Sequence, residues 1–517
     1  RPYPQEVFAA LTLLTSAFLF SNGIYMAIFA GSATLRMRRT GREPVAGPEE
    51  ERGVRHWVIL PQYKEDVEVV SMALRSIAAS ASARSSICIL LGMEEREGEE
   101  AQRKARELQS RFAGQFCDIV ASFHPKDLPN DPPGKASNLA WAFRQLMERL
   151  DGLPADLAKV VLTVADADSE FCSGYFEHLA RSFIEAGEDR RELRIWQSPV
   201  FHLKNYHRQP MPVMVGTMFT CMNELAALAD PNAVRFPYST YSLSLSLARR
   251  VGGWDAEWIA EDYHMGIKCF LLTLGQTTVE PILLPTINYT PEDADCTWWG
   301  TILARWSQAK RHALGFSDMA YYFMMLPLIF SHAVSVDTGV QKLQAFWSMA
   351  TFGVTLLVRL VNVHVVIGIL STYSLGSSLL RIIMLLFISA DRNINFLFTR
   401  TQFCPQLLMG SGLCCTVLVS GLFISVYLLV QHRIEDRPPF RFAALHFARN
   451  AVAIIVCGPV YFFGLGYCIW EAAIRVICSN SFAYEVAPKP AASRGVANCS
   501  TGAQECEACE AVVGLKR

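Results

Sequence analysis

Long apolar runs lie towards both ends of the chain and leave a more polar stretch between them. The first run, Val7 to Gly31, is long enough to cross a bilayer and is followed at once by the basic residues 36–42. Because positive residues beside a first span stay cytoplasmic, we expect residues 36–317 to lie in the cytosol. The later apolar runs are Met319 to Val336, Leu343 to Leu370, Ser377 to Ala390, Leu407 to Val430 and Ala451 to Trp470.

Hydropathy therefore predicts one amino-terminal span and roughly three to five carboxyl-terminal ones. Two of the later runs also fit interfacial or re-entrant helices, because Ser377 to Ala390 is short and Met319 to Val336 contains Pro327. Arg359, His364 and Arg381 lie in or beside these runs and indicate either a polar path through the bundle or side chains that snorkel to its surface. The arginines around Pro438 predict a second cytoplasmic segment.

The middle stretch alternates between strand-like and helix-like patterns. Short apolar runs predict strands over His56 to Gln62, Ser86 to Gly92, Asp118 to Phe123, Lys159 to Ala165 and Arg194 to Gln197. Helical periodicity fills the intervals at Asp66 to Ala83, Glu94 to Phe112, Ala136 to Leu150 and Gly174 to Ala186. This order predicts an α/β domain with a mainly parallel sheet and helices on both faces.

Composition narrows the class of protein. A hydrophobic fraction of 51% and a mean hydropathy of +0.22 over 517 residues favour a membrane protein. The formal net charge of -1 gives no reason to expect a nucleic-acid partner. The 15 cysteines are scattered singly, as free thiols in a reducing compartment are. Cys506 and Cys509 resemble half a zinc site, but a disordered tail explains them better.

Two carboxylates follow the buried strand predicted before residue 166. Asp166 and Asp168 share a facing along an extended backbone, at the sheet edge where open α/β folds bind ligands. Two hard oxygen ligands suit a divalent cation that also binds substrate phosphates. The Asp-x-Asp spacing alone is more often a solvated turn after a strand, so the site depends on the other motifs.

Further motifs appear in a fixed order around these aspartates. They are Leu60 to Glu65, Pro133 to Asn138 with Lys135 at a helix start, Trp196 to Pro199 with Gln197, Gly252 to Asp255 with Trp254, Ala260 to Tyr263 with Asp262, and Arg305 to Gly315 with Gln308, Arg311 and His312. The ordered set resembles the membrane-bound family 2 glycosyltransferases, which include cellulose, chitin and hyaluronan synthases and ceramide glucosyltransferase. The resemblance covers about residues 54–316, and the flanking spans fit the same layout.

The resemblance implies a GT-A domain that transfers a sugar from a nucleotide donor with inversion. It implies that Asp166 contacts the nucleotide sugar, that Asp168 coordinates Mg²⁺ or Mn²⁺ and that Asp262 is the general base. Gln308 and Arg311 match the Gln-x-x-Arg-Trp motif that closes over the nucleotide. Chemistry agrees, because an inverting transfer needs a base for the acceptor hydroxyl and positive charge at the leaving diphosphate. Lys135 and Arg311 would supply fixed positive charge there.

Two positions depart from the family pattern. His312 replaces the tryptophan that stacks on an acceptor sugar, which argues against processive elongation. The second strand ends in Gly92-Met93-Glu94-Glu95, where the family has an acidic pair for the base and ribose, so Glu94 is our candidate. We expect Trp254, His312 and Gln197 on the acceptor side.

Simpler interpretations of these residues stay open. The pair Glu261-Asp262 also suits the first turn of a helix, Trp254 an apolar plug and Lys135 an exposed surface. Three tryptophans suit an interfacial aromatic belt better than sugar platforms: Trp298, Trp299 and Trp306.

We therefore expect an inverting glycosyltransferase with a UDP-sugar donor, a divalent metal and a lipid or glycan acceptor. A processive polysaccharide synthase is one alternative, and a non-catalytic scaffold with the same shell is another. The expected parts are an amino-terminal transmembrane segment (1–35), a cytosolic GT-A domain (54–317), membrane helices (318–478) and a disordered tail (479–517).

Overall fold

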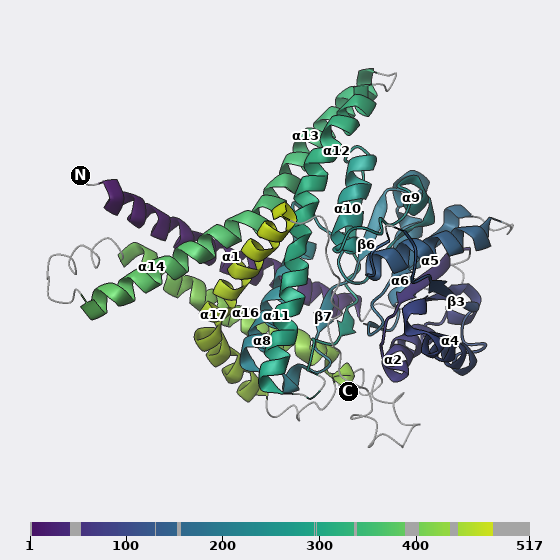
Figure 1. The fold of residues 1–517 in the computed structure, drawn as a ribbon, viewed down its shortest axis with the longest axis horizontal. Helices are drawn as coiled ribbons and strands as arrows, with labels where there is room; N and C mark the ends of the chain where they lie inside the picture. The colour runs from purple at the N-terminus through teal and green to yellow at the C-terminus, as the bar shows by residue number, and fades with distance from the viewer. Residues whose placement is uncertain are drawn as a thin grey trace, which may run out of the picture.

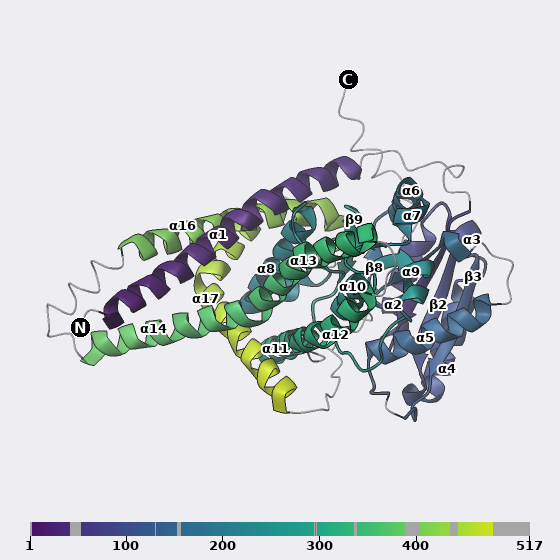
Figure 2. The ribbon, with the colours of Figure 1, turned by 90° about the horizontal axis from the view of Figure 1, so that it is seen from above.

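The computed structural model describes residues 3–41, 53–129, 131–151, 157–293, 295, 297–334, 339–387, 403–434 and 443–478. The predictions for the tail from residue 479, with Cys506 and Cys509, and for Arg437 and Arg441 lie outside these residues. A mixed α/β body forms one end of the molecule, and long helices extend from it to the other end (Figures 1 and 2).

A seven-stranded sheet is the centre of the α/β body, with the strand order β3-β2-β1-β4-β8-β6-β9. Its strands are β1 (Arg55–Pro61), β2 (Ile87–Glu94), β3 (Asp118–His124), β4 (Val160–Val164), β6 (Arg194–Gln197), β8 (Tyr241–Ser244) and β9 (Thr278–Pro281). The five predicted strands are all present. The pairs among β3, β2, β1 and β4 are parallel, as predicted.

Two strands of the large sheet, β8 and β9, were not predicted, and β8 runs against its neighbours. β8 pairs antiparallel with both β4 and β6, with Leu243 opposite Leu162 and Ile195. A second sheet of three short strands, in the order β5-β10-β7, lies beside the large one. It consists of β5 (Glu170–Phe171), β10 (Thr286–Asn288) and β7 (Val200–His202).

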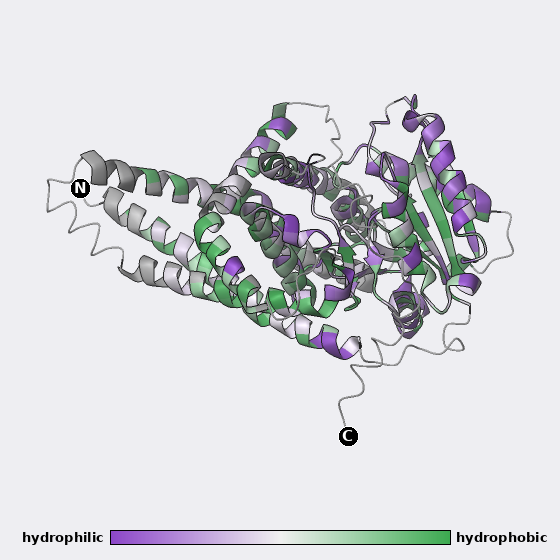
Figure 3. Ribbon diagram, turned by 90° about the horizontal axis from the view of Figure 1, so that it is seen from below, coloured by the Kyte–Doolittle hydropathy of each residue, from purple (hydrophilic) through white to green (hydrophobic). Residues whose placement is uncertain are grey.

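Helices cover both faces of the large sheet because successive strand residues point to opposite sides. One face packs on α2 (Val67–Ala78), α4 (Glu99–Arg111) and α6 (Tyr175–Glu185), and the other on α5 (Lys135–Leu150), α9 (Leu245–Arg250) and α10 (Glu261–Leu272). The short helices α3 (Ala83–Ser86) and α7 (Glu188–Arg191) lie in connections. The strands are apolar, whereas the covering helices turn polar residues outward (Figure 3).

The remaining helices form the elongated end. They are α1 (Tyr3–Thr40), α8 (Met211–Ala229), α11 (Trp298–Ala313), α12 (Ser317–Val334), α13 (Gly339–Val361), α14 (Ile367–Phe387), α16 (Phe403–Val430) and α17 (Ala443–Cys478). Helix α8 is the main surprise, because the sequence placed it in a soluble insert. It packs on α1 and α17 and shares a buried apolar cluster with α16.

Among the described residues, four helical segments are long and apolar enough to cross a membrane: Ala10–Thr40, Met211–Ala229, Gly353–Ser377 and Cys414–Arg433. The first and last agree with predicted runs. The two runs predicted over residues 343–390 are instead one continuous helix through Phe387, with a π-helical turn at Asn362–Val366. Helices α12 and α17 are not among the four.

Two of the charged positions in these helices face protein. The Arg359 guanidinium lies 4.7 Å from the centroid of the Phe236 ring, and His364 is buried beside Gly315. Phe236 stacks on Tyr263 of α10, and Gly315 lies in the turn that directly follows α11, so snorkelling does not describe these side chains.

Candidate active site

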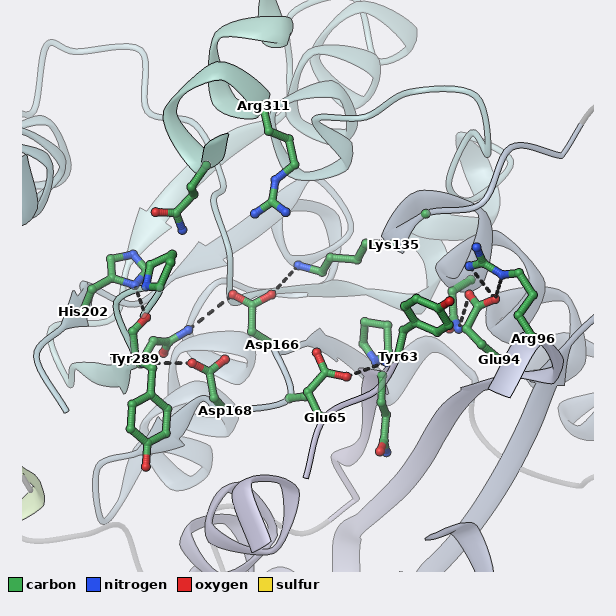
Figure 4. Close-up of a pocket in the computed structure, with 18 residues that line it drawn as sticks. Tyr63, Glu65, Glu94, Arg96, Lys135, Asp166, Asp168, His202, Tyr289 and Arg311 are labelled. Atoms are coloured by element: carbon green, nitrogen blue, oxygen red, sulfur yellow. Dashed lines mark hydrogen bonds and ion pairs between the residues drawn. The ribbon is translucent and has the colours of Figure 1, made fainter. Parts of the chain in front are cut away.

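A single pocket gathers the residues that the sequence placed on the donor side. It is lined by the ends of β1, β2 and β4, the start of α5, the end of the small sheet and one face of α11. Its lining includes Glu94, Lys135, Asp166, Asp168, Gln308 and Arg311. Figure 4 shows Arg311 and Lys135 on one side of Asp166, and Glu94 with Arg96 and Tyr63 towards the far end.

The two aspartates lie in a turn after β4 rather than on extended backbone. The Ser169 N–H bonds to the Asp166 carbonyl at 2.9 Å, which closes this turn. Asp168 is only 2% exposed, and its Oδ2 accepts the Tyr289 N–H at 2.8 Å. The buried Lys204 ammonium bonds the Asp168 carbonyl at 2.7 Å and so holds the turn from behind. Both carboxylates therefore reach one pocket, as predicted, although by a different backbone path.

Lys135 is no surface lysine, because it joins two carboxylates. Its Nζ lies 2.7 Å from Asp166 Oδ1 and 2.7 Å from Glu261 Oε1, and it donates to the Ser239 carbonyl at 3.2 Å. Burial lowers the pKa of Lys135, but the charges of Asp166, Glu261 and Asp262 raise it further, so the net shift is upward. Burial also raises the pKa of Glu261 to about 7, against the opposing charge of Lys135.

Ser239 links the donor-side aspartate to the predicted base. Its hydroxyl donates to Asp166 Oδ2, and its N–H donates to Asp262 Oδ2 at 2.7 Å. Asp262 also accepts the Tyr263 N–H at 2.8 Å, in the first turn of α10. Ser239 has a φ of 55°, which lies in the left-handed region and is uncommon for a residue with a side chain.

 The φ of 55° at Ser239 is tolerated because its two hydrogen bonds, to Asp166 and Asp262, hold the residue in place. Ser239 is separated by 73 positions from Asp166, and no local signal in the sequence marks it.

Gln197 was expected on the acceptor side, but the structure buries it completely. Its Nε2 donates to the carbonyls of Ser198, Tyr238 and Thr240 at 2.7, 3.1 and 2.9 Å, and its Oε1 accepts the Tyr238 N–H at 2.9 Å. The amide is therefore engaged in fixing the segment on both sides of Ser239. Gln197 positions this segment and does not line the pocket.

Trp254 was also expected to contact the acceptor, and the structure places it in the core. It is 5% exposed, packs against the Phe143 ring at 5.5 Å and donates from Nε1 to the Tyr241 hydroxyl at 2.7 Å. That hydroxyl donates to Glu261 Oε2 at 3.0 Å. The alternative of an apolar plug therefore describes Trp254 better, although it reaches the site through Tyr241 and Glu261.

Glu94 anchors the far end of the pocket. It is 2% exposed and accepts bonds from Arg96 at 2.8 Å, Asn138 at 2.9 Å and His124 at 3.1 Å. Burial raises its pKa, but these bonds lower it more, so Glu94 is an ionised acceptor. The Arg96 guanidinium also lies 4.7 Å from the centroid of the Tyr63 ring, which makes a flat polar and aromatic end to the pocket.

Helix α11 carries the last motif along the pocket. Gln308 and Arg311 line it, and Arg305 donates to the Gln308 side chain and to Thr220 Oγ1 of α8. His312 is exposed and is not among the residues that line the pocket.

The tryptophans of α11 divide into two kinds. Trp298 and Trp299 are 51% and 69% exposed, as an interfacial belt requires. Trp306 instead stacks on Tyr467 of α17 at 5.7 Å, and so belongs to the packing between helices.

The carboxylates of Asp166 and Asp168 fit a divalent cation that a substrate also binds. No group of three or more His, Cys, Asp or Glu side chains that could hold a metal occurs in the described part of the chain. Mg²⁺ and Mn²⁺ sites on diphosphates need no such cage, because one or two carboxylates, waters and phosphate oxygens complete them. Asp168 with Asp166 is the pair of carboxylates that lines the pocket beside Lys135 and Arg311.

Comparison with known proteins gives a family match and remote structural likenesses. Solved structures similar to the chain include a mannosyltransferase from Pyrobaculum calidifontis in complex with GDP-Man and Mn²⁺ (11% identity, TM-score 0.42, 92% of this chain and 100% of that chain). They also include residues 1–349 of TarS from S. aureus (10% identity, TM-score 0.30, 77% and 90%) and glucosyl-3-phosphoglycerate synthase from Mycobacterium tuberculosis with Mg²⁺ and UDP (13% identity, TM-score 0.27, 48% and 75%). No curated protein matches the chain.

The family match is the informative one. The model of glycosyl transferase family group 2 matches residues 161–428, which is more than half of the 517 residues. The match begins in β4, directly before the aspartate turn, and extends through α10 and α11 into α16. The chain therefore belongs to glycosyl transferase family group 2.

Proposed function

We propose that the protein is an inverting glycosyltransferase that moves a sugar from a UDP-sugar to a lipid or glycan acceptor at a membrane. The observation that carries this proposal is the link through Ser239, whose hydroxyl bonds Asp166 and whose N–H bonds Asp262. An inverting transfer needs the donor and the base on opposite sides of one reacting carbon. A single residue that joins the two carboxylates supports such an arrangement.

Each side chain has a definite task in this proposal. Asp262, oriented by the N–H groups of Ser239 and Tyr263, takes the proton from the acceptor hydroxyl. Asp166 binds the nucleotide sugar, and Glu94 accepts hydrogen bonds from the base or ribose. Arg311 and Gln308 close over the nucleotide.

A divalent cation fits the same scheme. Asp168 would hold Mg²⁺ or Mn²⁺, which supplies charge neutralisation for the leaving diphosphate when bound. Lys135 holds positive charge between Asp166 and Glu261, so the pocket is not purely acidic before a donor enters.

We place the catalytic domain in the cytosol, because basic residues 36–42 follow the first apolar helix. Single transfer is favoured over processive elongation by His312, which stands where the synthases have a stacking tryptophan.

The test is release of nucleoside diphosphate from UDP- and GDP-sugars by detergent-purified protein with Mn²⁺ or Mg²⁺, in the presence of membrane lipid extract. Asp262→Asn is compared with Asp118→Asn, a surface carboxylate paired with Arg149. We expect turnover of one donor, a loss of about 10²- to 10⁴-fold in Asp262→Asn and none in the control. Absence of both turnover and metal-dependent donor binding would favour the scaffold alternative.

A further inference from the structure

A buried histidine lies on the same helix as the proposed base. His264 is 2% exposed and follows Asp262 by two residues on α10. Its Nδ1 lies 3.1 Å from Asp318 Oδ1, and its Nε2 lies 2.9 Å from Asp255 Oδ2. An ionised carboxylate only accepts hydrogen bonds, so both ring nitrogens must carry a proton to satisfy both contacts. The geometry therefore favours the imidazolium form.

The two carboxylates belong to different parts of the molecule. Asp255 lies in the connection between α9 and α10, and Asp318 is the second residue of α12. Helix α12 packs on α10 and leads into the long helix that starts at α13. His264 thus joins the base helix to a catalytic-domain loop on one side and to the helical end of the molecule on the other.

A second cation on α10 strengthens the loop contact. Lys268 follows His264 by one helical turn, and its Nζ lies 2.7 Å from Asp255 Oδ1 and 3.0 Å from the Gly253 carbonyl. Gly253 has a φ of +75°, and an added Cβ there would lie 2.4 Å from the Phe143 ring. The start of the 252–260 loop is therefore fixed at Gly253, and two side chains of α10, His264 and Lys268, bind Asp255 in the same loop.

Aromatic rings enclose the imidazole. Trp258 stacks on His264 with ring centroids 4.3 Å apart and an interplanar angle of 9°, and Tyr321 of α12 meets it edge-on at 4.4 Å. A charged ring gains from contact with an aromatic face. Both the loop and α12 contribute a ring, so they contact His264 by stacking as well as by hydrogen bonds.

The charges around the ring set its response to pH. Burial lowers the pKa of His264, but the hydrogen bonds and charges of Asp255 and Asp318 raise it more, so the net shift is upward. Burial raises the pKa of Asp318, against its bond to His264, and Asp262 adds to this. Lys268 is the other cation that faces Asp255. The imidazole therefore keeps its proton to a higher pH than an ordinary histidine does, and loses it as the pH rises through the raised pKa of His264.

We propose that protonated His264 is a positioning residue that latches the 252–260 loop and the start of α12 onto the base helix. The latch itself is independent of the proposed function. Only its consequence, the alignment of Asp262, rests on that function. Loss of the proton leaves the ring with a single N–H donor, so the hydrogen bond to Asp255 or the one to Asp318 is lost and the connection between the loop and α12 is weakened.

Protease access tests the latch without any sugar transfer. Glu257 is exposed within the loop, and Glu188, whose side chain is 86% exposed, serves as an internal reference. A glutamate-specific protease is applied to the full-length protein in detergent from pH 6 to 9, and the ratio of cleavage at the two sites is measured. In the wild type this ratio should rise with pH. In His264→Phe it should be about tenfold higher at pH 6 and independent of pH, because the hydrogen bonds of the charged ring to both carboxylates are lost.

Two further variants keep the result interpretable. Asp318→Asn retains the ring and should give an intermediate ratio. His56→Phe replaces an equally buried histidine that packs on Phe176, and should leave the ratio at the wild-type value. Equal ratios in His264→Phe and wild type at every pH would overturn the proposal.

Activity then separates the latch from the proposed function. With an active donor, His264→Phe should lower kcat while nucleotide affinity stays unchanged, and the decline of kcat with rising pH should disappear. A wild type that transfers no sugar but shows the pH-dependent cleavage would refute the proposed function and leave the latch standing. An unchanged kcat and pH profile in the variant would refute the positioning role.

Discussion

The donor-side and acceptor-side candidates differ in how closely the structure follows the sequence prediction. Every donor-side candidate, from Glu94 to Arg311, lines one pocket. On the acceptor side, Gln197 is a buried clamp, Trp254 is a core residue and His312 lies outside the pocket lining. Most donor-side candidates follow a strand end or start a helix, which a parallel sheet brings to one edge, whereas Gln308 and Arg311 reach the pocket from the last turns of α11. The acceptor-side candidates come from the end of β6, the connection between α9 and α10, and α11, whose mutual arrangement no short motif specifies.

After the loss expected for Asp262→Asn, the largest effect is expected on the donor side, at the proposed metal ligand. Asp168→Asn should lower Mn²⁺-dependent turnover by about 10²- to 10³-fold, because a charge that stabilises the transition state is lost. It keeps the Tyr289 N–H contact, so the thermal midpoint should change little. Calorimetric titration with UDP, with and without Mn²⁺, measures the binding part. Metal-stimulated binding equal to the wild type would contradict the assignment.

Gln197→Ala tests whether that residue is a clamp or an acceptor contact. Removing a buried amide with four hydrogen bonds should destabilise the protein by about 2–4 kcal/mol, because backbone groups are left unpaired. Chemical denaturation in detergent gives the free energy of unfolding. A variant of wild-type stability with only a raised acceptor KM would restore the original interpretation.

Trp254→Phe separates packing from hydrogen bonding in the core. The ring contact with Phe143 remains, but the bond to the Tyr241 hydroxyl is lost, so we expect a loss of about 1–2 kcal/mol. The acceptor KM should be unchanged. A large rise in KM at unchanged stability would place Trp254 in the acceptor site after all.

Glu261 gives the site a pH signature. Its pKa rises from 4.5 to about 7 on folding, so the folded state binds an extra proton between these values. Stability should therefore fall as the pH rises from about 4.5 to about 7. Glu261→Gln should flatten this part of the profile of thermal midpoint against pH. A slope identical to the wild type would show that another group is responsible.

The smallest effect is expected at His312, where His312→Trp restores the family residue. The position is exposed, so stability should change by less than about 0.5 kcal/mol. Product length, measured by gel filtration or mass spectrometry, is the informative readout. Longer glycans in the variant would show that this residue limits elongation, and single additions in both would leave the limit elsewhere.

The sequence by itself determined five of the seven strands of the large sheet, the donor-side candidates that line the pocket and the apolar runs of α1 and α16. These features follow from local periodicity and from motifs at strand ends, which need only neighbours in the chain. It missed β8, because an antiparallel strand inside a mainly parallel sheet has no separate local pattern. It also missed that α8 is long and apolar enough to cross a membrane, because this helix lies between β7 and β8, inside the stretch predicted to be a soluble insert.

Tertiary structure alone decided how the carboxylates are joined. Ser239 meets Asp166 across 73 positions, Lys135 meets Asp166 across 31, and His264 meets Asp318 across 54. Such partners are fixed by how β8, α10 and α12 pack, and not by the identity of adjacent residues. The physical reason is that a buried charge must find its partner within hydrogen-bonding distance in space, whereas the sequence specifies only distance along the chain.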